Sequence, residues 1–529
     1  MGPVFFVFFS KGHKRALLAP PSKRLLHFIK TEFLVNSVFF VPFSVSPVGP
    51  VAPSRFASWE IFRTFEKTIP MKRLTLFLLY LLFPLSLLAQ EGTWNGKLNV
   101  GGQKLRLVFH LSQQTDGWHA TMDSPDQGVK GIPVDSVALS PLGLTMSIKA
   151  LSMSYTGGFM GKDNLVGALN QHGQSLSLML TRGEPERPSR PQEPKKPYPY
   201  RTEEVSFASR DGGLELHGTL TLPAGEGRYP ALVLVTGSGT QNRDEELMDH
   251  RPFLVLADRL TRAGYAVLRY DDRGFGASKE EQQRLAYSTT DHLMLDALGA
   301  FDFLLAHSAI DPARVGVGGH SEGGTIAVMA AAEESRVAFV VSLAGMMTTG
   351  AELLATQNRA LMQAQGVPEA MAASYARALE RLYAQWQQQA PDELMKDVDR
   401  LVAECVSGEP LPAPFVENLK LVAQGAQNPW LYRFVQLDPL AKVEKVAGRP
   451  MWAANGSKDL QVDAEQNLGR LDALNRDEIT TLRFEGMNHL FQPCTTGLTT
   501  EYGQIETTLA EEVMTALIAW LNQAINPQK

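Results

Sequence analysis

Residues 319–323 read G-H-S-E-G and fit the G-x-S-x-G pattern, with Ser321 at the centre. The β-branched Val315 and Val317 precede the pattern, and the apolar run TIAVMAAA follows it. This order of strand, turn and helix is typical of a nucleophile elbow, which presents a serine hydroxyl at a sharp turn. Glycines are required at both ends because side chains there would collide across the turn. We therefore predict that Ser321 is a nucleophile; the alternative is an ordinary serine in a glycine-rich turn.

A serine is a weak nucleophile at neutral pH and needs a neighbouring general base. Of the eleven histidines, His489 lies in GMNHLFQP, directly after the expected strand TTLRFEG. Loops at the carboxyl ends of parallel strands carry the chemistry of open α/β sheets. His320 should point away from Ser321, and His250 lies in the loop after the first central strand. We predict that His489 is the base.

The base in turn needs a carboxylate that orients the imidazole and stabilises its cation. Asp459 follows the expected strand PMWAANG, and Asp463 lies four residues further on. Asp459 is preferred because it is nearer to the end of the strand, with Asp463 as the alternative. The chain order Ser321, Asp459, His489 is the order expected for α/β-hydrolases.

The negative oxygen of a tetrahedral intermediate requires backbone N–H donors. One donor should be Glu322, the residue after the nucleophile. The second should come from the loop after the expected strand ALVLVTG, where Ser238 is the first choice and Gly237 the neighbour. The glycines of this loop would let a substrate approach the backbone closely.

These residues need a sheet to position them, and 201–529 supplies one. Strand patterns alternate with helical patterns, which predicts an α/β fold with a mostly parallel sheet covered on both faces. The expected strands are 231–237, 266–272, 314–320, 337–345, 450–456 and 480–486, and a hairpin is expected around 211–213. No strand pattern occurs across about 346–445, which is helical instead. We expect a helical cap over the site, the alternative being a helical excursion elsewhere on the surface.

The preceding segments have a different character. Residues 91–182 contain short alternating runs between turn signals, which predicts a small all-β accessory domain. Residues 183–200 are rich in proline and charge and are expected to form an extended linker.

Residues 71–90 read MKRLTLFLLYLLFPLSLLAQ and are typical of a secretory signal peptide, which predicts a secreted or periplasmic protein. A membrane anchor is the alternative, but the apolar run is short for a span and Pro84 interrupts it. Residues 1–70 are predicted to be a non-native or disordered extension upstream of a true start at Met71. The alternative is a long targeting region.

Composition narrows the possible partners. The net charge is −6, so the chain lacks the broad basic field of a nucleic-acid-binding protein. The two cysteines, Cys405 and Cys494, fit no zinc spacing, and they are expected to be unpaired thiols unless an oxidising compartment joins them. No metal or organic cofactor is implied, no membrane span is expected in the mature chain, and the oligomeric state is left open.

From about residue 203 onward the chain resembles the α/β-hydrolase superfamily, and within it the secreted bacterial serine esterases described as serine-aminopeptidase-like hydrolases. The resemblance rests on the stretches VTGSGTQNRDE, RYDDRGFGAS, GGHSEGG, NPWLYRFVQLDP, GSKDLQV and MNHLFQ. It implies triad roles for Ser321, Asp459 and His489, and a structural role for the segment 271–273. The β-rich domain falls outside it.

The expected function is hydrolysis of small or medium carboxylic esters through an acyl-enzyme at Ser321. A serine peptidase or a thioesterase on the same fold is the alternative, although no acidic cluster for a free amine can be identified in the sequence. A non-catalytic binding protein on this scaffold is a third possibility, against which the complete set of triad residues argues.

Overall fold

The structure is a computed structural model and describes residues 90–100, 103–127, 129–171, 174–280 and 282–525. The predicted extension at 1–70 and the predicted signal peptide, apart from Gln90, lie outside the described residues. The chain divides into two compact units, one that ends at Glu186 and one that begins at Arg187.

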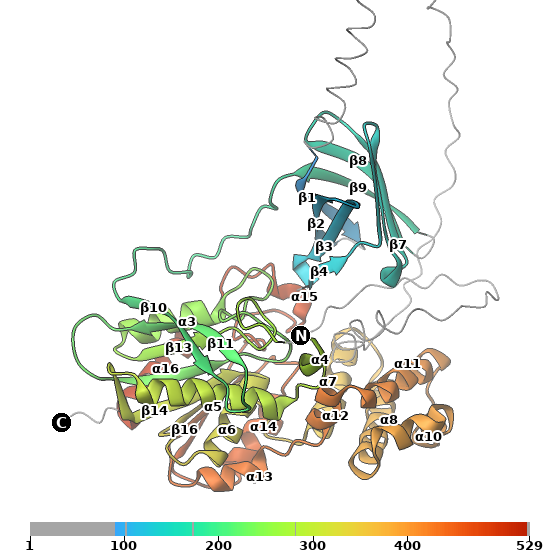
Figure 1. Cartoon of the computed structure of the whole chain (residues 1–529). Helices are drawn as coiled ribbons and strands as arrows, with labels where there is room; N and C mark the ends of the chain where they lie inside the picture. Colours follow the sequence, from blue (N-terminus) through green and yellow to red (C-terminus); the bar gives the residue numbers. More distant parts are fainter. Residues whose placement is uncertain (1–89, 101–102, 128, 172–173, 281, 526–529) are drawn as a thin grey trace, which may run out of the picture. The chain divides into compact units, whose positions relative to one another are not determined.

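The first unit is a curved antiparallel sheet, coloured blue to teal in Figure 1, in the strand order β4-β3-β2-β1-β9-β8-β7-β6-β5. Strand β1 pairs with both β2 and β9, so the first and last strands lie side by side. One face is buried around large side chains that include Trp94, Phe109 and Tyr155. The strands are β1 Gly92–Val100, β2 Gln103–Gln114, β3 Gly117–Ser124, β4 Val129–Pro133, β5 Ser136–Ser140, β6 Gly143–Ile148, β7 Met153–Phe159, β8 Asn164–Gln171 and β9 Gln174–Arg182.

The second unit contains an eight-stranded sheet in the order β10-β11-β13-β12-β14-β15-β16-β17. The expected hairpin is the antiparallel pair β10 and β11, and all strand pairs from β13 to β17 are parallel. The strands are β10 Arg201–Ala208, β11 Glu215–Leu222, β12 Tyr229–Val235, β13 Ala266–Tyr270, β14 Ile310–His320, β15 Val340–Leu343, β16 Met451–Gly456 and β17 Ile479–Phe484. The predicted fold class, an all-β region followed by an α/β-hydrolase sheet with helices, is confirmed.

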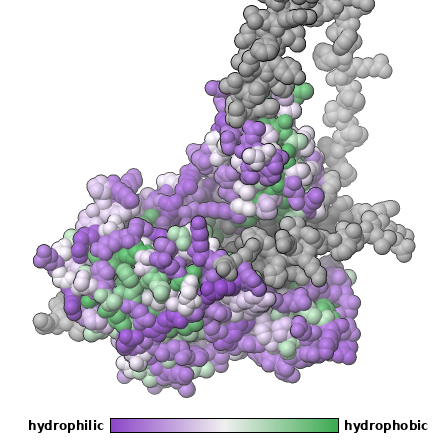
Figure 2. All heavy atoms as spheres, in the orientation of Figure 1, coloured by the Kyte–Doolittle hydropathy of each residue, from purple (hydrophilic) through white to green (hydrophobic). Residues whose placement is uncertain are grey.

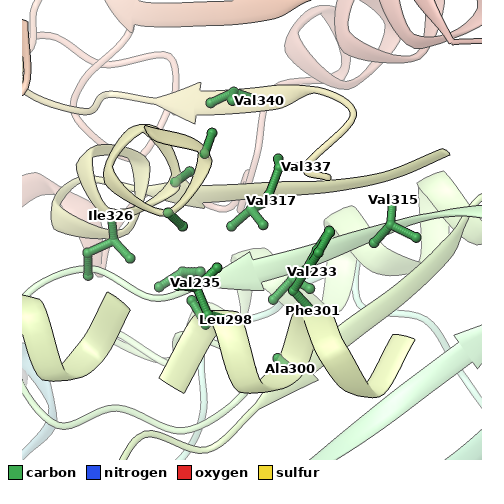
Figure 3. Packing of buried hydrophobic residues seen from close by; sticks show 14 of the residues in the cluster. Val233, Val235, Leu298, Ala300, Phe301, Val315, Val317, Ile326, Val337 and Val340 are labelled. Carbon is green, nitrogen blue, oxygen red and sulfur yellow. The ribbon is translucent and has the colours of Figure 1, made fainter. Parts of the chain in front are cut away.

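Helices cover this sheet on both faces. On one face α5 (Thr290–Ala306) and α6 (Glu322–Glu333) pack against β12 and β14; Figure 3 shows Leu298 and Phe301 of α5 turned toward valines of these strands. On the other face α3 (Pro252–Arg262) and α16 (Glu511–Ala524) bury a second apolar cluster. The short helices α4 Gln282–Ala286 and α15 Thr499–Tyr502, and the helix α14 Ala464–Asp472, complete the unit.

Between β15 and β16 the chain forms helices joined by loops, contains no strand, and has a core of its own. Trp386, Tyr375 and Leu379 are fully buried in this core, which also reaches Met329 of α6 and Met346. The helices are α7 Gly350–Ala364, α8 Glu369–Gln388, α9 Pro391–Leu394, α10 Val398–Cys405, α11 Ala413–Gln424, α12 Pro429–Val435 and α13 Leu440–Val443. We call residues 344–450 the helical insertion; its place in the chain is the one expected for the cap.

The proline-rich segment 183–200 contains no regular element but is held firmly from residue 187 onward. Arg190 donates to two backbone carbonyls of the segment 503–509, at 2.8 and 3.0 Å. Gln192 bonds to the backbone of the same segment through both its amide oxygen and its amide nitrogen. This part of the expected linker therefore lies fixed on the second unit.

Other features of the described residues bear on partners. None of their helices has the length and apolar character needed to cross a membrane. On the face shown in Figure 2, most surface residues of the helical insertion are hydrophilic. No group of three His, Cys, Asp or Glu side chains within 90–525, as far as it is described, could hold a metal ion. Cys405 and Cys494 are both free thiols, so the disulfide left open by the sequence does not form in this structure.

Candidate active site

Ser321 lies at the junction of β14 and α6. Strand β14 ends at His320, helix α6 begins at Glu322, and Ser321 between them has φ 54° and ψ −120°. Positive φ is uncommon for a residue with a side chain and is typical of strained turns at functional sites. The backbone N–H of Ser321 donates to the carbonyl of Leu343 at 2.8 Å, which fixes the turn to the neighbouring strand.

The glycines around Ser321 are required by the closeness of the backbone. A Cβ atom on Gly319 would lie 2.4 Å from the carbonyl oxygen of Val235 and 2.5 Å from the carbonyl carbon of Gly323. A Cβ atom on Gly323 would lie 2.0 Å from the same Val235 oxygen. Contacts this short would force the strand or the helix to move. The pattern therefore serves a tight elbow, as the spacing of the glycines predicts.

His489 and Asp459 form a buried pair at the carboxyl ends of β17 and β16. The Nδ1 atom of His489 lies 2.7 Å from Oδ2 of Asp459, and both side chains are fully inaccessible to solvent. The other carboxylate oxygen, Oδ1, accepts from the backbone N–H groups of Gln461 and Val462 at 2.8 and 2.9 Å. The loop thus fixes the orientation of the carboxylate, and the carboxylate fixes the imidazole.

Asp463 has a different task. It is the N-cap of α14, and its carboxylate accepts from the backbone N–H of Gln466 at 2.7 Å. Aspartate is favoured at this position because it satisfies a free N–H of the first helical turn. Of the two candidate acids, the structure brings Asp459 to His489 and assigns Asp463 to the helix.

The Nε2 atom of His489 is buried and has no hydrogen-bond partner among the described residues. The hydroxyl of Ser321 therefore does not reach it within hydrogen-bond distance here. Such contacts are often long without substrate and tighten in the reacting complex. The ring of His320, the residue before Ser321, lies 4.6 Å from the ring of His489, centre to centre, so the loop of His489 packs against the end of β14.

The predicted oxyanion donors are not equivalent. Glu322 is the first residue of α6, so its N–H belongs to the helix-terminal donors that have no acceptor within the helix. Gly237 lies beside Ser321, since a Cβ atom on it would be 3.2 Å from the Ser321 Cβ. Its N–H, however, donates to Oε1 of Glu245 at 2.8 Å and is not available to a substrate in this structure. Ser238 is left as the expected second donor.

We call residues 236–241, which include Gly237 and Ser238, the oxyanion loop. The side chain of Asp272 fixes this loop. Asp272, after β13, accepts from the hydroxyl of Thr236 and from the N–H of Gln241 at 2.8 Å each, and so holds both ends of the loop. Burial raises the pKa of Asp272 well above its usual range, and these donors oppose the effect. The role of Asp272 in this structure is to shape the oxyanion loop.

The carboxylate of Glu322 joins the elbow to the helical insertion. Its Oε1 accepts from the hydroxyl of Thr290 at 2.6 Å and from Nε1 of Trp430 in α12 at 2.9 Å. Burial raises the pKa of Glu322, while Thr290, Trp430 and Ser238 favour its charged form. The insertion therefore contacts the residue that follows the nucleophile, which is the arrangement a cap requires.

Sequence reasoning did not identify the pair formed by His320 and Glu245. The carboxylate of Glu245 lies 2.9 Å from Nδ1 of His320, and both side chains are buried. The available signal was a histidine at the end of a buried strand, where a polar side chain must find a partner. Its partner lies 75 positions earlier in an irregular loop, where no periodicity points to it.

Comparison with known proteins gives matches over part of the chain. Residues 251–492 match the family model described as Serine aminopeptidase, S33, and the matched range contains Ser321, Asp459 and His489. Over this range the chain is similar to serine hydrolases of the α/β-hydrolase superfamily. The first, all-β unit lies outside the matched range.

The individual relatives are distant in sequence from this chain. Esterase EstD of Thermotoga maritima is 28% identical over 287 residues, which are 54% of this chain and 60% of the esterase. Thiohydrolase aneE of Aspergillus aculeatus is 31% identical over 140 residues, which are 26% of this chain and 40% of that protein. The solved structure of the Pyrococcus furiosus esterase Pf2001 aligns with a TM-score of 0.38 at 14% identity and covers 65% of this chain and 100% of that one. The chain thus spans about 60% of EstD and less than half of aneE.

Proposed function

We propose that this hydrolase cleaves carboxylic esters of small or medium acyl groups through an acyl-enzyme on Ser321. One observation carries the proposal: in the buried pair of Asp459 and His489, Nε2 of the imidazole has no partner in the described part of the chain and lies near a strained elbow that contains a serine. This combination supplies a nucleophile, a base and an orienting acid in the roles that acyl transfer requires.

The reaction would proceed in two halves. His489 takes the proton of the Ser321 hydroxyl as the serine oxygen attacks the ester carbonyl, and then gives that proton to the departing alcohol. Water, deprotonated by His489 in the second half, releases the carboxylic acid and restores the serine. The N–H groups of Glu322 and Ser238 would stabilise the negative oxygen in both halves.

The electrostatics suit His489 as a base. Burial lowers the pKa of His489, and Asp459 opposes this effect by favouring the imidazolium. The histidine is therefore neutral, and able to accept a proton, down to a pH below the ordinary range of histidine. The acid limb of kcat/KM, which reports the free base, should accordingly lie below that range.

Thioester hydrolysis is the second candidate, because a thiohydrolase is among the relatives. The same residues would perform it, since only the leaving group differs. Peptide hydrolysis is a third, suggested by the name of the matching family. A panel of chromogenic esters of graded chain length, matched thioesters and aminoacyl amides separates the three.

Ser321→Ala should abolish turnover of the best substrate in that panel and the covalent labelling of the protein by a fluorophosphonate. Loss of a triad nucleophile costs about a millionfold in turnover. Circular dichroism and thermal unfolding show whether the variant is folded. A folded variant that retains activity within tenfold of the parent would place the chemistry elsewhere.

We also propose that the protein is exported, on the strength of the residues at 71–90. Amino-terminal sequencing of the protein recovered from the producing cell tests this. A mature terminus near Gln90 supports export and processing, whereas a mature chain that retains residues before Met71 contradicts it.

A further inference from the structure

The pair of Glu245 and His320 makes three contacts that reach both sides of the candidate site. Oε1 of Glu245 accepts from the N–H of Gly237 at 2.8 Å and lies 2.9 Å from Nδ1 of His320. Nε2 of His320 lies 2.8 Å from the carbonyl oxygen of His489, and the two imidazole rings are in contact. One side of the pair therefore holds the oxyanion loop, and the other side holds the loop of the base.

The partners of His320 determine its proton count. A backbone carbonyl can only accept, so Nε2 of His320 must carry a hydrogen. As a carboxylate, Glu245 can only accept, so its Oε1 accepts from Nδ1 of His320 as well as from the N–H of Gly237. Both nitrogens therefore donate, and the arrangement is an imidazolium bonded to a carboxylate. Burial alone would lower the pKa of His320, but Glu245 and the His489 carbonyl outweigh it and raise the pKa.

The surroundings make this ion pair costly to break. Glu245 and His320 border a small cavity whose other walls are mostly apolar, formed by Pro252, Phe253, Leu256, Leu343, Leu490, Phe491 and Leu509. Little solvent can screen the charges there, so removal of one partner leaves a buried charge uncompensated. Among the described residues, the Asp459 carboxylate also acts on both histidines, and Tyr502 lies against the backbone of His489.

We propose that Glu245 and His320 are positioning residues that set the oxyanion loop and the catalytic base of this hydrolase relative to each other. The pair needs no contact with substrate for this role, because it acts through the backbone of Gly237 and of His489. By occupying the Gly237 N–H, it also directs the donor role to the next residue, Ser238. The proposal rests on the esterase function proposed above.

The charge of His320 gives the proposal a measurable signature. The imidazolium disfavours protonation of His489, whereas Glu245 favours it. His320→Gln removes the cation, keeps a side-chain N–H for the His489 carbonyl and leaves the Glu245 carboxylate. The acid limb of kcat/KM should therefore move to higher pH. Glu245→Gln removes the carboxylate and with it the reason for the imidazolium, so both charges are lost and the limb should move less.

Rates of ester hydrolysis provide the second readout. In His320→Gln we expect kcat to fall about 100-fold with KM changed little, because misplacement of the base by a fraction of an ångström is felt in the transition state. In Glu245→Gln, which is nearly isosteric, we expect a fall of about tenfold. The matched control is Asp296→Asn, which weakens the buried pair of Arg273 and Asp296, a pair that makes no hydrogen bond to Glu245 or His320 among the described residues. It should lower the unfolding temperature but leave the acid limb in place.

The variants are compared in the full-length protein, with thermal unfolding recorded for each. Folded His320→Gln and Glu245→Gln proteins with kcat within threefold of the parent and an unchanged acid limb would overturn the proposal. A rate loss that only follows the loss of stability, as in Asp296→Asn, would also overturn it. If His320→Gln does not fold, Glu245→Gln alone decides through kcat. A parent protein inactive on every ester would overturn the proposed function itself, and the proposal with it.

Discussion

The strands of the N-terminal sheet and those of the hydrolase sheet are covered in different ways. In β6 and β7 buried and more exposed residues alternate, so one face of the N-terminal sheet carries its core. In β12 every residue after Tyr229 is buried, because helices cover both faces. A sheet buried on both faces can offer its chemistry only at the strand ends, and Ser321, Asp459 and His489 all follow such ends. The N-terminal sheet has no comparable edge where loops from several parallel strands meet.

The comparison predicts that Asp→Asn substitutions at two positions of one loop have very different effects on turnover. Asp459→Asn keeps the size of the side chain but reverses its preference for the imidazole tautomer, and turnover should fall about ten-thousandfold. Because Asp459 also opposes the low pKa of His489, any activity left should show an acid limb at lower pH. Steady-state rates across a pH series measure both effects.

Asp463→Asn is the matched control, since asparagine also caps helices well. It should retain near-normal turnover. The reverse ranking would transfer the role of orienting acid to Asp463, and two mild effects would contradict the triad.

A smaller effect is expected where the helical insertion touches the elbow. Trp430→Phe removes the donor to the Glu322 carboxylate, a hydrogen bond to a charged group that contributes about 1.5–3 kcal/mol. We expect a shift of roughly tenfold in the ratio of kcat/KM between long and short acyl esters, measured with graded chromogenic substrates.

Trp386→Phe is the control for this change, because Trp386 is buried in the core of the insertion and is stacked on Tyr432. It should alter stability without altering the chain-length profile. Equal profiles for both variants and the parent would argue that the insertion is not a cap.

The smallest effect is expected from removal of the first unit. A chain that begins at Arg187 keeps Arg190 and Gln192, which fix the proline-rich segment to the second unit, and keeps every candidate site residue. Its kcat/KM on short water-soluble esters should stay within about threefold of the parent, as expected for parts that act independently. A loss greater than tenfold in a folded protein would show that the N-terminal sheet supports the site.

Sequence patterns located the hydrolase strands well because each is a short buried run bounded by turn signals. The runs expected at 231–237 and 450–456 are strands Tyr229–Val235 and Met451–Gly456. We preferred Asp459 over Asp463 only because Asp459 is nearer to the end of a strand. In the structure, this position just after β16 brings Asp459 to His489. Local patterns suffice for such features because the residues that follow parallel strands all lie at the same edge of the sheet.

Contacts between distant loops could not be predicted in this way. Arg190 bonds to a carbonyl 313 positions further along the chain, and a proline-rich composition says nothing of such a partner. The engagement of the Gly237 N–H likewise depends on Glu245, which has φ 52° in an irregular loop. Hydrogen bonds of this kind follow from the three-dimensional path of loops, which has no periodic trace in the sequence.

At Ser321 the residue that best suits the backbone conformation differs from the residue that the proposed reaction needs. Glycine adopts positive φ at no steric cost, whereas a serine held in such a conformation costs about 1–3 kcal/mol. A population selected only for thermal stability would therefore drift toward glycine at this position and lose the hydroxyl. Serine at this position therefore lowers the stability of the elbow and supplies the hydroxyl that the proposed reaction requires.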